Sequence, residues 1–213
     1  ITSSEPHYIP YSYTSGTPHQ RAVLAAYKGA QVQLTLDTDL IVNDPQYIYG
    51  ASRIMGLDLT DVSHAILQTL NLNNLTALRT LDISCAGTQT TLNNLIVDGC
   101  KNLRTINMGG LQSPQLTSMD LSKNTKLESF LASDTALTGV TFAKGALLSK
   151  AVLPASLQTL DLEYLPRLQM GGLTLEGTDN VTRLVVDSCP GIDWTLLMTR
   201  CPNVKHLRVT GIE

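Results

Sequence analysis

The chain has 213 residues, of which 43% are hydrophobic, and a formal net charge of −3 at pH 7 that is spread without charged runs. This composition supports one substantial core and excludes an intrinsically disordered chain. It offers no basic surface for nucleic acid, and no apolar stretch reaches the roughly 20 residues that a membrane-spanning helix needs. We therefore expect neither nucleic-acid binding nor membrane insertion.

The first fifty residues differ from the rest because they hold six of the seven tyrosines. The sequence Thr-Pro-His-Gln at 17–20 has the pattern of a capped helix start, which predicts a short helix over 18–28. Alternating polar and apolar residues over 31–36 predict a half-buried strand. We interpret residues 1–53 as an N-terminal lead-in and α/β cap that covers the edge of the first repeat.

From Ile54 to Ile212 one phrase, apolar-x-x-apolar-x-apolar, recurs about every 11 to 13 residues. Such repetition is typical of a solenoid, whose units must stack to bury their apolar faces. The repeats form two alternating series, which start at Ile54, Leu78, Leu103, Leu127, Leu148 and Met170, and at Leu67, Leu92, Leu116, Leu137, Leu157, Val181 and Val204.

Each series has a spacing of about 20 to 25 residues, so one coil holds two short strands. We predict a β-rich solenoid of six to seven coils over residues 54–213, with few helices. If the repeats stack in register, Leu81, Ile106 and Phe130 must be neighbours in successive coils.

The segment 116–133, LTSMDLSKNTKLESFLAS, resembles the short leucine-rich repeats that are common in surface proteins of gut Bacteroidetes. In those repeats an L-x-x-L-D-L-S-K-N-x-x-L half alternates with an L-x-x-L-x-C/A-S half. The resemblance implies a leucine-rich repeat fold, a right-handed superhelix of short strands.

Three pieces depart from the clean repeat: residues 143–147, residues 153–155 and a helix-like insertion at 191–200. Together with residues 47–53 and 207–212, they resemble leucine-rich regions in large tail-associated virion proteins of phages that infect such bacteria. This second resemblance implies a virion location and a role in host recognition or structure.

In leucine-rich repeats the x residues of each strand face outward. By analogy with the family, we take the series of Leu78, Leu103 and Leu127 as the main concave sheet, where adjacent coils bring polar side chains into three rows. These rows are Arg79, Arg104 and Glu128; Thr80, Thr105, Ser129 and Lys150; and Asp58, Asp82 and Asn107.

We expect the three rows to bind a polar partner, such as a protein loop or a surface glycan. The alternative is that these are solvated strand residues that keep the stack soluble. The second series presents an almost uncharged face, for which a structural role is the favoured interpretation. Its members are Gln68, Asn71, Asn93, Asn94, Thr117, Ser118, Asp120, Thr138, Thr141, Gln158, Thr159 and Asp161.

The cysteines follow the repeat, because Cys100 and Cys189 each lie eight residues after a repeat start. The leucine-rich pattern places a small buried polar residue there, at the turn out of the strand. With Cys85 and Cys201 they could pair as disulfides, but free buried thiols are favoured. No C-x-x-C or Cys/His cluster indicates a metal site, and no cofactor is expected. We expect Trp194 to be a core residue.

Catalysis has little support, because no nucleophile elbow, phosphate-binding loop or H-E-x-x-H motif occurs. The acidic segment 37–44 lacks calcium-loop spacing. A polysaccharide-cleaving solenoid would need paired carboxylates, for which Asp58 and Asp82 are the nominees. We expect a non-catalytic binding or assembly module.

The first residue is Ile1 rather than Met, and we expect a processed chain or a piece of a longer one. The module would belong to a larger phage tail-associated virion protein and contact other subunits or domains of that assembly. The alternative is a secreted or cell-surface adhesion protein of a gut bacterium.

Overall fold

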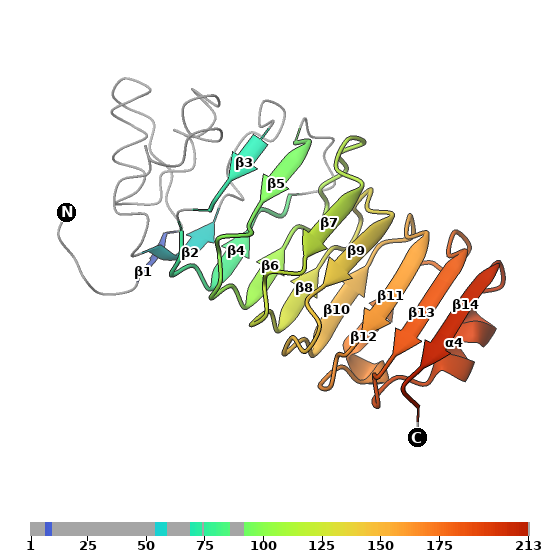
Figure 1. The fold of residues 1–213 in the computed structure, drawn as a ribbon. Helices are drawn as coiled ribbons and strands as arrows, with labels where there is room; N and C mark the ends of the chain where they lie inside the picture. The colour runs from blue at the N-terminus through green and yellow to red at the C-terminus, as the bar shows by residue number, and fades with distance from the viewer. Residues whose placement is uncertain (1–6, 10–53, 59–68, 74, 86–91, 213) are drawn as a thin grey trace.

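The computed structural model describes residues 7–9, 54–58, 69–73, 75–85 and 92–212. Their strands stack in two parallel rows along a β-solenoid of about six turns (Figure 1). The predicted β-rich solenoid is therefore confirmed.

The first series of repeats forms one seven-stranded parallel sheet, which we call the first sheet. From β2 onward, neighbouring strands of this sheet are every second strand of the chain, because each coil contributes one strand to each sheet. It contains β1 (His7–Ile9), β2 (Ile54–Asp58), β4 (Thr80–Asp82), β6 (Thr105–Asn107), β8 (Ser129–Leu131), β10 (Lys150–Leu153) and β12 (Leu173–Leu175).

The second series forms the other row, which we call the second sheet and which divides into three parallel groups. They are β3 (Thr69–Asn71) with β5 (Asn94–Ile96), β7 (Ser118–Leu121) with β9 (Gly139–Phe142), and β11 (Thr159–Glu163) with β13 (Arg183–Asp187) and β14 (His206–Thr210). The predicted alternation of the two series is confirmed for these strands.

A helix replaces a first-sheet strand in the last coil. The helix α4 (Trp194–Arg200) lies in the chain between β13 and β14, where the alternation would otherwise place a strand. Asp193 caps it by accepting a hydrogen bond from the backbone N–H of Leu196 at 3.1 Å. The helix-like insertion expected at 191–200 is thus a helix, and Trp194 packs partly buried against the core. A short 3-10 helix, η3 (Met170–Gly172), precedes β12.

The core is a set of apolar rows that run along the stack. Leu81 pairs with Ile106, and Ile106 with Phe130, in successive coils. All three side chains are at most 1% exposed. Phe130 also contacts Phe142 of the second sheet edge to face, with ring centroids 5.7 Å apart and planes at 79°. The predicted neighbour relation is confirmed, so the repeats share one interior.

Small polar groups close the turns inside the stack. The thiols of Cys100 and Cys189 are buried and donate hydrogen bonds to the carbonyl oxygens of Leu72 and Leu162, at 3.2 and 3.3 Å. Asn124 is fully buried at a similar turn and donates to two carbonyl oxygens of the preceding coil. Cys100, Cys189 and Cys201 are buried free thiols, as expected. Cys85 is only half-buried, and its thiol donates to the Gly110 carbonyl at 3.2 Å. Burial raises the pKa of the Cys100 thiol to about 12, so it stays protonated.

Of residues 1–53, the structure describes only 7–9. The strand β1 pairs with β2 in parallel and so extends the first sheet at its N-terminal edge. The helix expected over 18–28, the strand expected over 31–36 and the acidic segment 37–44 lie outside the described residues. The division into a cap over 1–53 and a solenoid over 54–213 remains a prediction.

Candidate functional site

The predicted rows of polar residues exist on the first sheet. Strand pairing places Thr80 beside Thr105, Thr105 beside Ser129, and Ser129 beside Lys150. Backbone hydrogen bonds also link the row of Arg79, Arg104 and Glu128 from coil to coil. Arg104 N–H donates to the Arg79 carbonyl at 2.7 Å, and Glu128 N–H donates to the Arg104 carbonyl at 2.8 Å. Each row therefore repeats at the strand spacing of about 4.8 Å.

The side chains of these two rows are accessible. Arg79, Arg104 and Lys150 are exposed, and Glu128 is half-buried. Within the part of the chain that the structure describes, none of these four forms an ion pair. They present cations, a carboxylate and hydroxyl groups on a rigid backbone, which suits a polar partner.

The third predicted row has a structural use. Asp82 Oδ1 accepts hydrogen bonds from the N–H and hydroxyl of Ser84, at 3.0 and 2.6 Å, and Asn107 Oδ1 accepts one from Gly109 N–H at 3.0 Å. The side chains of Asn71 and Asp120 likewise accept a hydrogen bond from the backbone N–H two residues later, at the ends of their strands. These residues stabilise the turn that follows each strand. Strand pairing aligns Asp58 with Asp82, but the Asp58 side chain lies outside the described residues.

A polar groove interrupts the second sheet between β5 and β7. It measures about 330 Å³, and it brings together several of the residues expected on this face. Asn93, Asn94, Thr117, Ser118 and Asp120 line it. Amides and hydroxyl groups of this kind can dock sugars, although none of the described residues that line the groove is aromatic.

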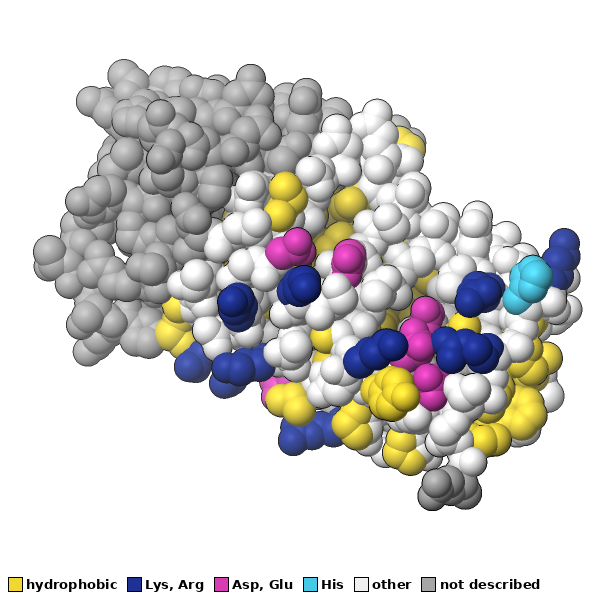
Figure 2. All heavy atoms as spheres, in the orientation of Figure 1, with side chains coloured by type: hydrophobic (Ala, Val, Ile, Leu, Met, Phe, Trp, Pro, Cys, Tyr) yellow, Lys and Arg dark blue, Asp and Glu magenta, His cyan; other side chains and the backbone are white. Residues whose placement is uncertain are grey.

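The expectation of an almost uncharged second face is wrong at its C-terminal end. Figure 2 shows acidic side chains there with basic side chains on both sides. Arg208 Nη2 lies 2.8 Å from Glu163 Oε1, and Arg208 Nη1 lies 3.5 Å from Asp187 Oδ2. Lys144 Nζ lies 3.9 Å from Glu163 Oε1 and 5.7 Å from the centroid of the Tyr164 ring. We call Lys144, Asp161, Glu163, Asp187 and Arg208 the charge cluster.

The two carboxyl groups of β11, Asp161 and Glu163, have pKa values that are shifted in opposite directions. Burial, with Glu163 beside it, raises the pKa of Asp161 to about 6, and Asp161 Oδ1 is buried with no hydrogen-bond partner among the described residues. The hydrogen bond from Arg208 holds the pKa of Glu163 below its usual range. Val185 lies between Asp161 and Arg208 in the outward column and is only 1% exposed, because these longer side chains cover it.

The charge cluster joins three successive coils. Arg208 on β14 reaches Glu163 on β11 and Asp187 on β13, so it ties the last coil to the two before it. The cluster combines two cations with three carboxyl groups, and no group of described residues has the makings of a metal site. We interpret it as a structural ion-pair network rather than a catalytic centre.

Sequence reasoning missed the cluster, apart from Asp161. A signal was present, because aligning 157–164, 181–188 and 204–211 places Glu163, Asp187 and Thr210 in one column. The same alignment places Asp161, Val185 and Arg208 together in the neighbouring column. The ion pairs themselves depend on the side-chain conformations.

No protein-family model matches the chain, and no curated protein matches it. No helix in the described part of the chain is both long and apolar enough to cross a bilayer.

Proposed function

We propose that the chain is a non-catalytic binding or assembly module that engages its partner through the outward face of the first sheet. The binding residues are Arg79, Thr80, Arg104, Thr105, Glu128, Ser129 and Lys150, with Asp82 and Asn107 fixing the turns at the end of the rows. The partner is a protein loop or a surface glycan.

The observation that carries the proposal is the unbroken register of β4, β6, β8 and β10. It holds four polar side chains in a line, beside two arginines that have no ion-pair partner among the described residues. Because these residues lie on paired strands, their backbone is already ordered, and binding a partner costs little backbone entropy. A surface of this kind suits recognition better than chemistry.

Binding of the fluorescently labelled chain to cells of gut Bacteroidetes species, measured by flow cytometry, tests this role. We expect saturable binding that falls at least about tenfold in the double variant Arg79→Ala, Arg104→Ala, because charge-assisted contacts are each worth about 1.5–3 kcal/mol. The matched control is Arg167→Ala, Arg200→Ala, which removes two exposed arginines elsewhere. Equal loss in both double variants would mean that only net charge matters.

The polar groove of the second sheet is the competing surface. The double variant Asn94→Ala, Thr117→Ala alters its lining and leaves the first sheet intact. If this variant loses binding while the arginine variant retains it, the proposed face is wrong.

We further propose that the module belongs to a larger phage tail-associated virion protein and serves host recognition or structure. This rests on the resemblance of the irregular pieces to leucine-rich regions of such proteins. Mass spectrometry of purified virions should find peptides of this chain; their absence would reject the virion location. A lipoprotein-type signal upstream in the reading frame would instead favour the adhesion protein of a bacterial surface.

An enzymatic role finds no support in the geometry of the nominated pair. Asp82 lies beside Asp58 in strand register, but its Oδ1 already accepts two hydrogen bonds from Ser84. If the chain has a measurable depolymerase activity that a folded Asp82→Asn variant loses, the enzymatic alternative would be supported.

A further inference from the structure

Two adjacent coils in the middle of the solenoid are joined along one sheet and separate along the other. On the first sheet these coils contribute β4 and β6, which pair in register through Leu81 and Ile106. On the second sheet they contribute β5 and β7, which belong to different strand groups. Figure 1 shows β5 and β7 as successive strands of that row. The polar groove lies in this separation.

Strand edges form the two walls of the groove. The Ile96 carbonyl accepts a hydrogen bond from the coil of β3, and the Thr117 carbonyl accepts one from the coil of β9, at 2.9 and 2.7 Å. Successive residues of a strand direct their backbone groups to opposite sides, so those of Leu95 and Ser118 point into the groove. Among the described residues, no backbone hydrogen bond joins the two walls. These backbone groups can therefore bond to a ligand.

The polar side chains of the rim are also without partners in the described part of the chain. Five exposed residues supply amides and hydroxyl groups that make no hydrogen bond there: Asn93, Asn94, Gln115, Thr117 and Ser118. In the next coil, by contrast, Thr138 Oγ1 donates to the Thr117 carbonyl at 3.0 Å. Amides and hydroxyl groups both donate and accept, which matches the hydroxyl groups of a sugar.

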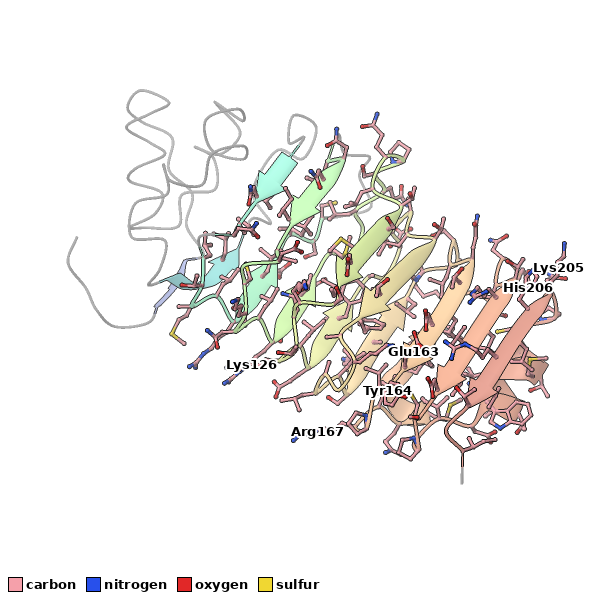
Figure 3. All side chains as sticks on the ribbon, viewed as in Figure 1. Lys126, Glu163, Tyr164, Arg167, Lys205 and His206 are labelled. Atoms are coloured by element: carbon pink, nitrogen blue, oxygen red, sulfur yellow. The ribbon has the colours of Figure 1, made fainter. Side chains whose placement is uncertain are left out.

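The charges at the groove disfavour an anionic ligand. Asp98 and Asp120 are exposed and line it, and no Lys, Arg or His occurs among its described lining residues. Lys123 lies near Asp120 but outside this lining. Figure 3 shows Lys126 and Arg167 away from β5 and β7. Because like charges brought together at an interface cost free energy, a neutral ligand is favoured.

The groove is small and has an apolar floor. The inward residues Leu95 and Met119 are 8% and 4% exposed, whereas Leu70 and Leu184, on strands of the same row, are at most 1% exposed. The volume of about 330 Å³ is at the lower end of the roughly 300–1,000 Å³ of small-molecule sites. A single sugar ring, with C–H groups on its face and hydroxyl groups at its margin, matches both the floor and the rim.

A partner strand matches the groove less well than a small ligand. The wall formed by β5 is only three residues long, Asn94–Ile96, so an inserted strand would gain few backbone hydrogen bonds there. It would also have to fit between coils that are already joined at the first sheet. A small ligand avoids both requirements.

From this geometry we infer that the groove between β5 and β7 binds one neutral hexose unit. The sugar hydroxyl groups bond to the amide of Asn94, the hydroxyl of Thr117 and the backbone of Ser118, and the C–H face of the ring lies over Leu95 and Met119. This site goes beyond the proposed function, because it uses the second sheet and none of the first-sheet rows.

Saturation-transfer difference NMR on the whole chain tests the inference. The probes are D-glucose, D-galactose and D-mannose, and we expect saturable binding of at least one of them. A ligand of about twelve non-hydrogen atoms should bind with a Kd on the order of 1 mM. The uronate of the sugar that binds keeps the ring and adds a carboxylate, and should bind at least about fivefold more weakly.

The double variant Asn94→Ala, Thr117→Ala tests the rim. It should weaken hexose binding at least about tenfold, because two hydrogen bonds are lost. The matched control Thr141→Ala, Gln158→Ala removes a hydroxyl and an amide from exposed positions of the same sheet outside the groove, and should change binding less than about twofold.

A second double variant, Asp98→Asn, Asp120→Asn, tests the charge. It should improve binding of the uronate at least about threefold and leave hexose binding almost unchanged. Asparagine can keep the turn that Asp120 caps, because Asn107 accepts the same backbone hydrogen bond in its own coil.

Several outcomes would overturn the inference. They are absence of binding for all three hexoses, equal binding of the uronate, and equal loss in the rim variant and its control. Slow hydrogen exchange of the Leu95 and Ser118 amides before sugar is added would show that a strand already fills the groove, and would also overturn it. The first-sheet variant Arg79→Ala, Arg104→Ala should retain hexose binding, so failure here is distinguishable from failure of the proposed function.

Discussion

The middle coils and the last coil place the same kind of residue in different surroundings. Phe130 in β8 and Leu207 in β14 are both inward members of stacked strands, yet they are 0% and 45% exposed. The strand β8 pairs with β6 and β10, whereas β14 pairs with β13 alone. In a solenoid the neighbouring coils bury a residue, so the same repeat position is core in a middle coil and partly exposed in the last described coil.

The largest expected effect is on the core of the middle coils. Phe130→Ala removes a fully buried ring that contacts Phe142, and we expect a loss of about 3–5 kcal/mol in the free energy of unfolding. Leu207→Ala should lose less than about 1 kcal/mol, because almost half of the side chain is already exposed. Urea unfolding followed by circular dichroism measures both.

Fluorescence of Trp194, the only tryptophan, sharpens this test because it reports on the last coil. If unfolding is cooperative, the fluorescence and circular dichroism transitions coincide. Similar losses in Phe130→Ala and Leu207→Ala would contradict the comparison and indicate that the edge is covered in solution.

A smaller effect is expected at the turns. Asn124 is fully buried and bonds the Val97 and Cys100 carbonyls, both at 3.1 Å, so Asn124→Ala should cost about 2–3 kcal/mol by leaving them unsatisfied. Asn203 is exposed and donates to the Asp179 carbonyl at 2.7 Å, where water can replace it. Asn203→Ala should therefore cost at most about 1 kcal/mol, which thermal and urea unfolding can resolve.

The smallest effect is a change in how stability depends on pH. The pKa of Asp161 is raised to about 6 in the folded chain, so this carboxyl stabilises the fold when protonated. Its contribution is present below the ordinary value of 3.8 and is lost as the pH rises through about 6. Glu163 and Asp187 have lowered pKa values, and their contributions are lost as the pH falls through those values.

Asp161→Asn should raise the melting temperature above neutral pH by roughly 1–4 °C and leave it almost unchanged near about pH 4. Differential scanning fluorimetry across this pH range measures the effect. Asp98→Asn replaces an exposed acidic residue at a turn and should leave the shape of the profile unchanged. An unaltered profile in Asp161→Asn would mean that burial and the neighbouring Glu163 do not raise the pKa of Asp161 in solution.

Much of the fold could be predicted because the repeat is local. The apolar positions of each phrase fixed which side chains face inward, and the placement of Leu81, Ile106 and Phe130 in successive coils followed from their spacing. The rows through Arg79 and Thr80 followed in the same way. Their role in binding stays a prediction, because it depends on a partner.

Other features could not be predicted from spacing. The row of Asp82 and Asn107 was expected to contact a partner, but these side chains bend back to the turns that follow their strands. The charge cluster depends on Arg208 reaching Glu163, 45 residues earlier in the chain. The groove between β5 and β7 arises because the second sheet is interrupted there, which the repeat pattern alone does not indicate.

The sequence by itself determined the period, the inward face, the two strands per coil and the turn positions of the cysteines. These features are set by alternation along each strand and by the recurrence of one phrase. Only the tertiary structure decided which polar groups pair across coils. Those pairs depend on side-chain geometry between coils, because each strand of a solenoid is completed by its neighbours.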